Sequence, residues 1–129
     1  MTCIVINNDR FARNAFHLLI DETDDLILLA SFCNIFEASR FMSDHIVDLI
    51  IISVKIAETR SFEFIMAISN QIFVIFISEF SSIAIGELHN TDAIGRSKSV
   101  RFKTGIELAR NYNKAERNHF KYQVRSFVI

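Results

Sequence analysis

The sequence contains few of the residues that build the commonest cofactor sites. Its 129 residues include three glycines, two cysteines and no proline. The glycines, Gly86, Gly95 and Gly105, form no glycine-rich loop after the first apolar run, which argues against a Rossmann or P-loop nucleotide site. Cys3 and Cys33 stand in apolar surroundings without a CxxC or Cys/His spacing. We therefore expect no zinc or other metal site, no disulfide framework and no bound cofactor.

A long apolar run and a strong net charge are also missing. No uncharged apolar stretch approaches the roughly 20 residues of a membrane-spanning helix, and the N-terminus does not resemble a signal peptide. The formal net charge is −1, so the chain has little electrostatic attraction for nucleic acid or an anionic membrane. We expect a soluble, cytoplasmic protein that does not bind DNA through this domain.

Short apolar runs alternate along the chain with longer segments whose apolar residues recur at helical spacing. Half of the residues are hydrophobic, which at 129 residues is enough for one domain with a single core. The alternation is typical of repeated strand–helix units, and Asp9 and Asn34 stand where the first two helices need N-caps. The pattern predicts strands at 2–6, 26–32, 48–53, 72–78 and 93–96, and helices at 10–22, 35–42, 62–68, 81–88 and 100–112.

The third and fourth runs, VDLIIIS and IFVIFIS, are apolar on consecutive residues and each stops on a serine. Strands of this kind are covered on both faces, as in a parallel sheet with helices on either side. We therefore predict an α/β, flavodoxin-like (βα)5 three-layer sandwich with a five-stranded parallel sheet in the order 2-1-3-4-5. In such folds ligands bind beyond the carboxyl ends of the strands. The polar residues after the predicted strands are Asn7, Asn8, Asp9, Ser53, Ser78 and Lys98.

Four motifs occur in a characteristic order: IVINNDRFAR, VDLIIIS, VIFISEFSSIAI and DAIGRSKSVRF. Together they resemble the receiver domain of two-component response regulators, in particular the subgroup that precedes LytTR-type DNA-binding domains. The resemblance covers about residues 2–112. It implies a phosphorelay fold in which an aspartate at the end of strand three accepts a phosphoryl group and acids after strand one hold magnesium.

The chain departs from the receiver pattern at these functional positions. The phosphoacceptor position is occupied by Ser53. The acidic positions are occupied by Asn7 and Asn8, or by Asn8 and Asp9 if the register shifts by one residue. The resemblance thus implies a degenerate, or pseudo-receiver, site.

Two residues match the family pattern, Ser78 at the switch hydroxyl position and Lys98 at the lysine after strand five.

Two unit charges about 4 Å apart interact by roughly 4 kcal/mol at an effective dielectric of about 20, so the lost carboxylates weaken cation binding considerably. A serine hydroxyl needs an adjacent general base to act as a nucleophile, and no histidine follows a predicted strand. We expect no phosphoryl transfer to Ser53, and we expect Lys98 to pair with Asp9.

Each of these residues also has a purely structural interpretation. Ser53 and Ser78 can be hydroxyls at strand ends, Asn7 and Asn8 can be turn formers, and Lys98 can be a solvated lysine. The sequence leaves these alternatives open.

The function predicted from the sequence is a phosphorylation-independent, receiver-like signalling module that acts by protein–protein contact and is not an enzyme. The alternative is a regulatory domain that binds a small molecule or anion in the neutralised pocket. We expect a protein partner or a homodimer to use the fourth helix, fifth strand and fifth helix, with Phe80, Ile83 and Ile85 as interface residues.

The C-terminal residues form a separate segment in this prediction. We expect a receiver-like domain at 1–112 and an extension or tail at 113–129. The segment is basic and ends in the strand-like alternation KYQVRSFVI. It is either an extension of the last helix followed by a tail, or the first strand of a lost effector module.

Overall fold

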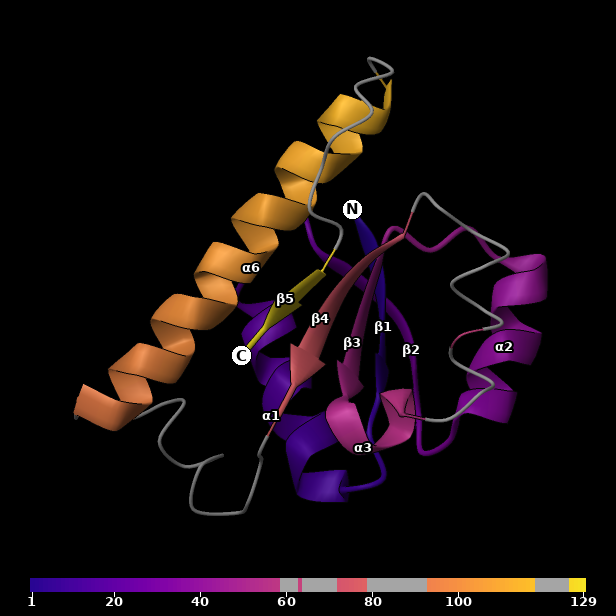
Figure 1. Ribbon diagram of the computed structural model, residues 1–129, viewed down its shortest axis with the longest axis horizontal. Helices are drawn as coiled ribbons and strands as arrows, with labels where there is room; N and C mark the ends of the chain where they lie inside the picture. The colour runs from indigo at the N-terminus through magenta and orange to yellow at the C-terminus, as the bar shows by residue number, and fades with distance from the viewer. Residues whose placement is uncertain (59–62, 64–71, 79–92, 118–125) are drawn as a thin grey trace.

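The chain folds into three layers, with a five-stranded parallel sheet between two layers of helices (Figure 1). The coordinates are a computed structural model. They describe residues 1–58, 63, 72–78, 93–117 and 126–129, and for 93–99 and 115–117 the backbone only. The strand order is β2-β1-β3-β4-β5, with all neighbours parallel, which confirms the predicted flavodoxin-like sheet.

The first four strands and the first two helices lie where the sequence predicts them. Asp9 caps the first helix, because its carboxylate accepts the backbone N–H of Phe11 at 2.8 Å. Asn34 caps the second through the N–H of Glu37 at 3.0 Å. The elements are β1 (Thr2–Ile6), α1 (Arg10–Asp21), β2 (Ile27–Phe32), α2 (Ile35–Asp44), β3 (Leu49–Ser53), α3 (Val54–Ala57), β4 (Phe73–Ile77), α6 (Ala93–Arg117) and β5 (Ser126–Val128).

Alternate residues of the strands fill two apolar cores, one on each face of the sheet. One core packs α1 and α6 against the sheet, and Phe16 of α1 meets Phe102 of α6 with ring centroids 5.9 Å apart. The other packs α2 and α3 against the opposite face, with Ile35 and Ala38 buried from α2. The central strands β1 and β3 are buried along almost their whole length, which explains their continuous apolar sequences.

Residues 54–57 correct one prediction. The sequence pattern predicts no helix between the strand at 48–53 and the helix at 62–68, but these residues form the short helix α3. The helix forms because Ser53 supplies a cap and because Ile56 and Ala57 pack on the second core. The helices predicted at 62–68 and 81–88 fall outside the described residues, apart from Glu63, which is helical.

The fifth strand is a second correction. Residues 93–96 do not form a strand, because they are the first turn of α6, which continues through the predicted helix 100–112 to Arg117. Buried residues at helical spacing, Phe102, Ile106 and Ala109, hold this long helix on the sheet. The strand beside β4 is β5, which comes from the segment 113–129 that the sequence sets apart as an extension or tail.

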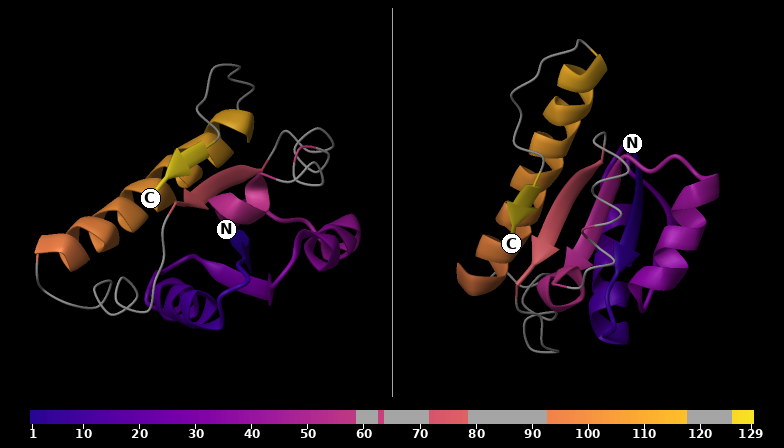
Figure 2. Two further views of the ribbon diagram at one scale, coloured as in Figure 1. Left: turned by 60° about the horizontal axis from the view of Figure 1, so that its bottom comes forward. Right: turned by 45° about the vertical axis from the view of Figure 1, so that its right-hand side comes forward.

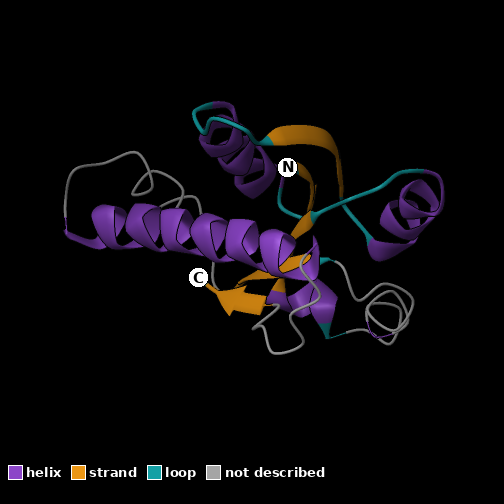
Figure 3. Ribbon diagram, turned by 90° about the horizontal axis from the view of Figure 1, so that it is seen from above, coloured by secondary structure: helices purple, strands orange, loops and turns teal. Residues whose placement is uncertain are grey.

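The connection to β5 has an unusual hand. The step from β4 to β5 crosses the sheet in the direction opposite to the step from β1 to β2, yet α6 and α1 cover the same face (Figure 3). The two crossovers therefore have opposite hands. The crossovers through α2 and α3 share the hand of the α1 crossover, because those helices cover the other face while the chain steps toward β4. About 98% of such crossovers are right-handed, so the β4–α6–β5 connection is the exceptional, left-handed one.

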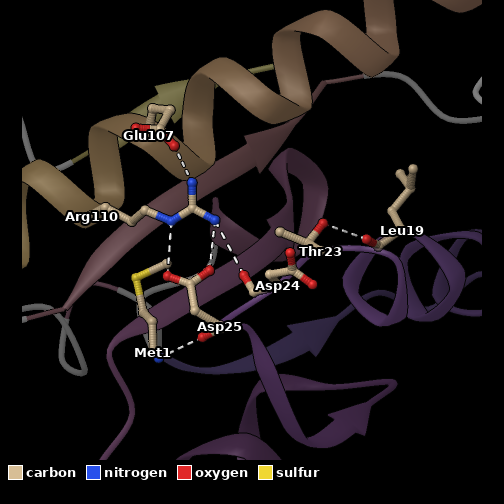
Figure 4. A network of polar contacts seen from close by, with 7 residues as sticks. All are labelled: Met1, Leu19, Thr23, Asp24, Asp25, Glu107 and Arg110. Atoms are coloured by element: carbon tan, nitrogen blue, oxygen red, sulfur yellow. Dashed lines mark hydrogen bonds and ion pairs between the residues drawn. The ribbon is translucent and has the colours of Figure 1, made fainter.

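A polar network joins α6 to the start of β2 (Figure 4). The Arg110 guanidinium donates from Nε to Asp25 at 3.0 Å and from Nη2 to the other carboxylate oxygen at 2.6 Å. Arg110 also pairs with Glu107 one turn earlier in α6. Asp25 has a left-handed backbone with φ of 64°, which aspartate tolerates better than most residues. No helix in the described part of the chain is both long enough and apolar enough to span a membrane.

Candidate functional site

Asn7 and Ser53 lie side by side at the carboxyl edge of the sheet. Ile6 of β1 is in register with Ile52 of β3, so the next residue of each strand is Asn7 and Ser53 respectively. Asn7 is 4% exposed and Ser53 is 8% exposed, and among the described residues these are the two buried polar side chains. Burial of a polar group is costly unless it is hydrogen-bonded, so their contacts determine what the site can do.

The Asn7 side chain is occupied by its own turn. Its amide oxygen accepts the backbone N–H of Asp9 at 2.9 Å, which makes the compact turn into α1. The backbone N–H of Asn7 donates to the carbonyl of Phe32 at 3.0 Å, and the backbone carbonyl of Asn7 accepts from the guanidinium of Arg13 at 2.5 Å. These contacts favour the turn-forming role among the interpretations that the sequence left open.

Asn8 and Asp9 complete the turn but do not point a pair of carboxylates into the site. Asn8 is exposed. The Asp9 carboxylate accepts the N–H of Phe11 and so caps α1. The one acid of the expected pocket therefore has a structural role in the first turn of a helix.

Ser53 is the last residue of β3 and the N-cap of α3. Its hydroxyl oxygen accepts the backbone N–H of Ile56 at 3.3 Å. The hydroxyl thereby satisfies a donor of the helix end that follows the strand. This contact explains the serine at the end of the apolar run VDLIIIS.

Ser78 follows β4 and is exposed. Because Ser53 is in register with Ile77, Ser78 lies one residue beyond Ser53 on the neighbouring strand. Its hydroxyl donates to the main-chain oxygen of Ile129 at 2.8 Å, and its backbone N–H donates to the same oxygen at 3.2 Å. Ser78 thus holds the residue that follows β5.

Lys98 is not placed as the sequence predicted. It follows no strand, because it belongs to α6, and the expected position after the fifth strand is taken by Ile129. The expected arrangement of Lys98 opposite Asp9 rested on that strand assignment. The interface residues Phe80, Ile83 and Ile85 lie outside the described residues.

The site has little chemistry for group transfer within the described part of the chain. His17 and His45 lie in α1 and just after α2, so neither adjoins Ser53 at a strand end. In the same described residues no group of three or more histidine, cysteine, aspartate or glutamate side chains is placed to hold a metal ion. The two buried polar side chains of this strand edge, Asn7 and Ser53, are therefore uncharged and satisfied by local hydrogen bonds.

A cavity beside α1 and β2 is a feature that the sequence reasoning missed. Its volume is about 390 Å³. His17 Nε2 is buried without a hydrogen-bond partner among the described residues, and burial, followed by the nearby charge of Arg13, lowers the His17 pKa below its ordinary value. No sequence spacing marks this cavity, because its walls meet only in the fold. They are His17, Leu18, Ile20, Asp21, Leu26 and Leu28.

Comparison with known proteins identifies the fold through solved structures. No protein-family model matches the chain, and no curated protein matches it significantly. The response regulatory domain of MrkE from Klebsiella pneumoniae matches with a TM-score of 0.63 at 15% identity, over 88% of this chain and 99% of that one. The response regulator domain of Thermotoga maritima CheB matches with a TM-score of 0.55 at 16% identity, over 89% and 95%.

A longer regulator shows the same similarity. RcsB from Salmonella enterica serovar Typhimurium, solved bound to promoter rprA in the presence of the phosphomimetic BeF3−, matches with a TM-score of 0.61 at 7% identity. The match covers 92% of this chain and 65% of RcsB, so the chain spans less than two thirds of that protein. The fold of the chain is that of response-regulator receiver domains.

Proposed function

We propose that this chain is a receiver-like signalling module that acts by contact with other proteins and does not accept a phosphoryl group. The observation that carries the proposal is the state of the two buried polar side chains at the carboxyl edge. Asn7 and Ser53 are neutral, and both are bonded to nearby backbone, one in a turn and one as a helix cap. On this proposal the pocket is a degenerate receiver site without catalytic residues.

Several finer assignments belong to the same proposal. Ser53 takes the phosphoacceptor position, while Asn7, Asn8 and Asp9 take the acidic positions. Ser78 takes the switch position. Lys98 is not retained, because it lies in α6 and follows no strand. The first three sequence motifs, IVINNDRFAR, VDLIIIS and VIFISEFSSIAI, support an origin in the subgroup of receivers that precedes LytTR-type domains.

We propose that the signal passes through the fourth-helix region to a protein partner or a second copy. Phe80, Ile83 and Ile85 support this assignment as a cluster of apolar residues in a short segment. Apolar residues that gather on a protein surface are typical of interaction sites, and on this proposal the segment forms such a site.

The proposal is tested by titrating the protein with Mg²⁺ and then with beryllofluoride, which mimics an aspartyl phosphate. The readout is the amide NMR shifts of Asp9, Ser53 and Ser78. We expect no saturable shift at millimolar Mg²⁺, because the neutral groups offer too little charge to hold the cation. The matched variant carries Asn8→Asp and Ser53→Asp, and it should gain Mg²⁺-dependent shifts. Saturable shifts in the unaltered protein, clustered on the same residues, would contradict the proposal.

A further inference from the structure

β5 lies along the edge of β4 (Figure 2). Side chains of α6 and of the residue after β4 contact it there. The strand is three residues long, Ser126–Val128. It pairs in parallel with β4, with Phe127 beside Ile75. Such a short strand contributes few backbone bonds, so the specificity of the site comes from the residues around it.

The ring of Phe127 fits a notch in α6. Gly105 makes the notch, because a Cβ at that position would lie 3.0 Å from Cδ1 of Phe127 and 3.0 Å from Cδ1 of Ile75. A larger residue at this position would press on both side chains, so glycine suits the close approach of helix, strand and ring. The Arg101 guanidinium covers the ring, with Cζ 5.2 Å from the ring centroid, and donates to the main-chain oxygen of Val128.

The residue after β5 is held as well. The main-chain N–H of Ile129 donates to Phe76 at 2.8 Å, and its oxygen accepts two hydrogen bonds from Ser78. The side chain of Ile129 is 6% exposed and belongs to the core between the sheet, α1 and α6. The site therefore recognises an extended segment with an aromatic ring and, two residues later, an aliphatic side chain.

The contacts of β5 with its groove are favourable, but the connection that brings β5 there is unusual. The β4–α6–β5 crossover has the hand that parallel connections rarely adopt. If the strand came from a second molecule, each contact of Phe127 and Ile129 would be kept and the crossover would no longer be needed. Exchange of an identical element between two copies is a low-cost route to a dimer. When the exchange is reciprocal, two-fold symmetry limits the assembly to two copies.

We propose that the groove formed by the β4 edge, Gly105, Arg101 and Ser78 is an acceptor site for residues 126–129 of a second copy, so that two copies exchange β5 reciprocally. The occupant follows from the structure, because the same segment already fills the groove within one chain. The exchange alters only the path between α6 and β5. This inference does not rest on the proposed function, since it needs neither Asn7 and Ser53 nor the segment with Phe80, Ile83 and Ile85. Ser78 takes part only through its hydrogen bonds to the main-chain oxygen of Ile129.

The decisive test uses the unaltered chain. A 1:1 mixture of ¹³C-labelled and unlabelled protein is unfolded, refolded together and examined by isotope-filtered NMR, with sedimentation to measure the dimer. We expect a dimer with a nuclear Overhauser effect between the Ile75 methyl of one copy and the Phe127 ring of the other. A monomer at millimolar concentration would overturn the proposal. So would a dimer in which the Ile75–Phe127 effect arises only within one copy.

Two variants separate donor from acceptor. Gly105→Val fills the notch but leaves the chain its own Phe127 to donate. Phe127→Ala leaves the notch open but removes the ring. We expect each alone to raise the dimer dissociation constant by at least about tenfold, and the two mixed to form a 1:1 complex. Val128→Ala is the matched control, because that side chain is 47% exposed, and it should dimerise like the unaltered chain. Folded variants that fail to combine would count against the exchange.

Discussion

Ser53 and Asn7 are buried polar residues whose hydrogen bonds are local. Ser53 bonds to a backbone group three residues ahead, and Asn7 bonds two residues ahead. Contacts of this range follow from the turn geometry of serine and asparagine, so they need no ligand to keep the groups satisfied. A carboxylate at either position would have to be desolvated with few partners, which is the cost that the neutral residues avoid.

Ser53→Asp should therefore destabilise the protein in metal-free buffer. Aspartate can still cap α3, but its charge would sit at a position that is 8% exposed. We expect the free energy of unfolding to fall by on the order of 2 kcal/mol at neutral pH, and by less at pH 4, where the carboxyl is partly protonated. Ser53→Asn is the matched neutral control in urea unfolding. An unchanged or raised melting temperature for Ser53→Asp would contradict this account.

The two cysteines should differ in reactivity. Burial raises the pKa of the Cys3 thiol to about 12, whereas Cys33 is exposed. We expect a thiol reagent to modify Cys33 in the folded protein and Cys3 only after unfolding. Rapid reaction of both thiols in native buffer would show that β1 is more accessible than the fold implies.

The same burial predicts a pH dependence of stability. The folded pKa of Cys3 lies above its ordinary value of 9.0, so its contribution is complete below pH 9 and is lost as the pH rises toward 12. The measurement is the free energy of unfolding between pH 8 and 11, compared with Cys3→Ala, which does not titrate. The gap between the two proteins should narrow as the pH rises.

At the scale of elements, α6 determines how the end of the chain is placed. It packs on the same core as α1. It carries the notch at Gly105 and also Arg101, whose guanidinium covers the Phe127 ring. Its other anchor is the Arg110 pair with Asp25 at the start of β2. The hydrogen bond from Arg110 lowers the pKa of Asp25, and the same bond raises the pKa of Arg110.

The Arg110–Asp25 ion pair should contribute only modestly to the free energy of unfolding. Its side chains are 27% and 52% exposed, so solvent screens the charges. A double-mutant cycle with Arg110→Gln and Asp25→Asn should give a coupling of about 1 kcal/mol or less in urea unfolding. Because the Asp25 pKa is depressed below 3.8, the coupling is present above that pH and is lost as the pH falls. Glu107→Gln is the control on the same helix, and a coupling that persists in strong acid would contradict the assignment.

At the scale of the whole molecule, the sheet is completed by the chain's last residues. β5 covers the edge of β4, and Ile129 fills the core on the α1 and α6 face. The opposite edge is β2, where Ile27 is 57% exposed. A receiver-like unit at 1–112 would therefore lack strand β5 and the apolar side chains of Phe127 and Ile129 that pack on this core.

Removal of 113–129 should lower stability substantially. Phe127 and Ile129 each contribute roughly 2 kcal/mol of apolar burial, so we expect a loss of about 3 to 5 kcal/mol for the chain 1–112 in urea unfolding. The chain 1–125 separates the loss of β5 and Ile129 from the loss of the end of α6, because it keeps α6 whole and lacks only 126–129. It should lose nearly as much as 1–112. A chain 1–112 as stable as the full sequence would contradict this role of β5.

Local pattern alone determined the first four strands, helices α1 and α2, and their caps at Asp9 and Asn34. Those features follow from apolar runs and from contacts within a few residues, which the sequence contains directly. Tertiary structure decided the fifth strand and the position of Lys98. Residues 93–96 join a helix because α6 buries Phe102 and Ile106 on the sheet. Residues 126–128 form a strand there because Gly105 leaves room for Phe127. Such contacts join residues more than 20 positions apart, and their energy appears only when the helix and the strand are both in place.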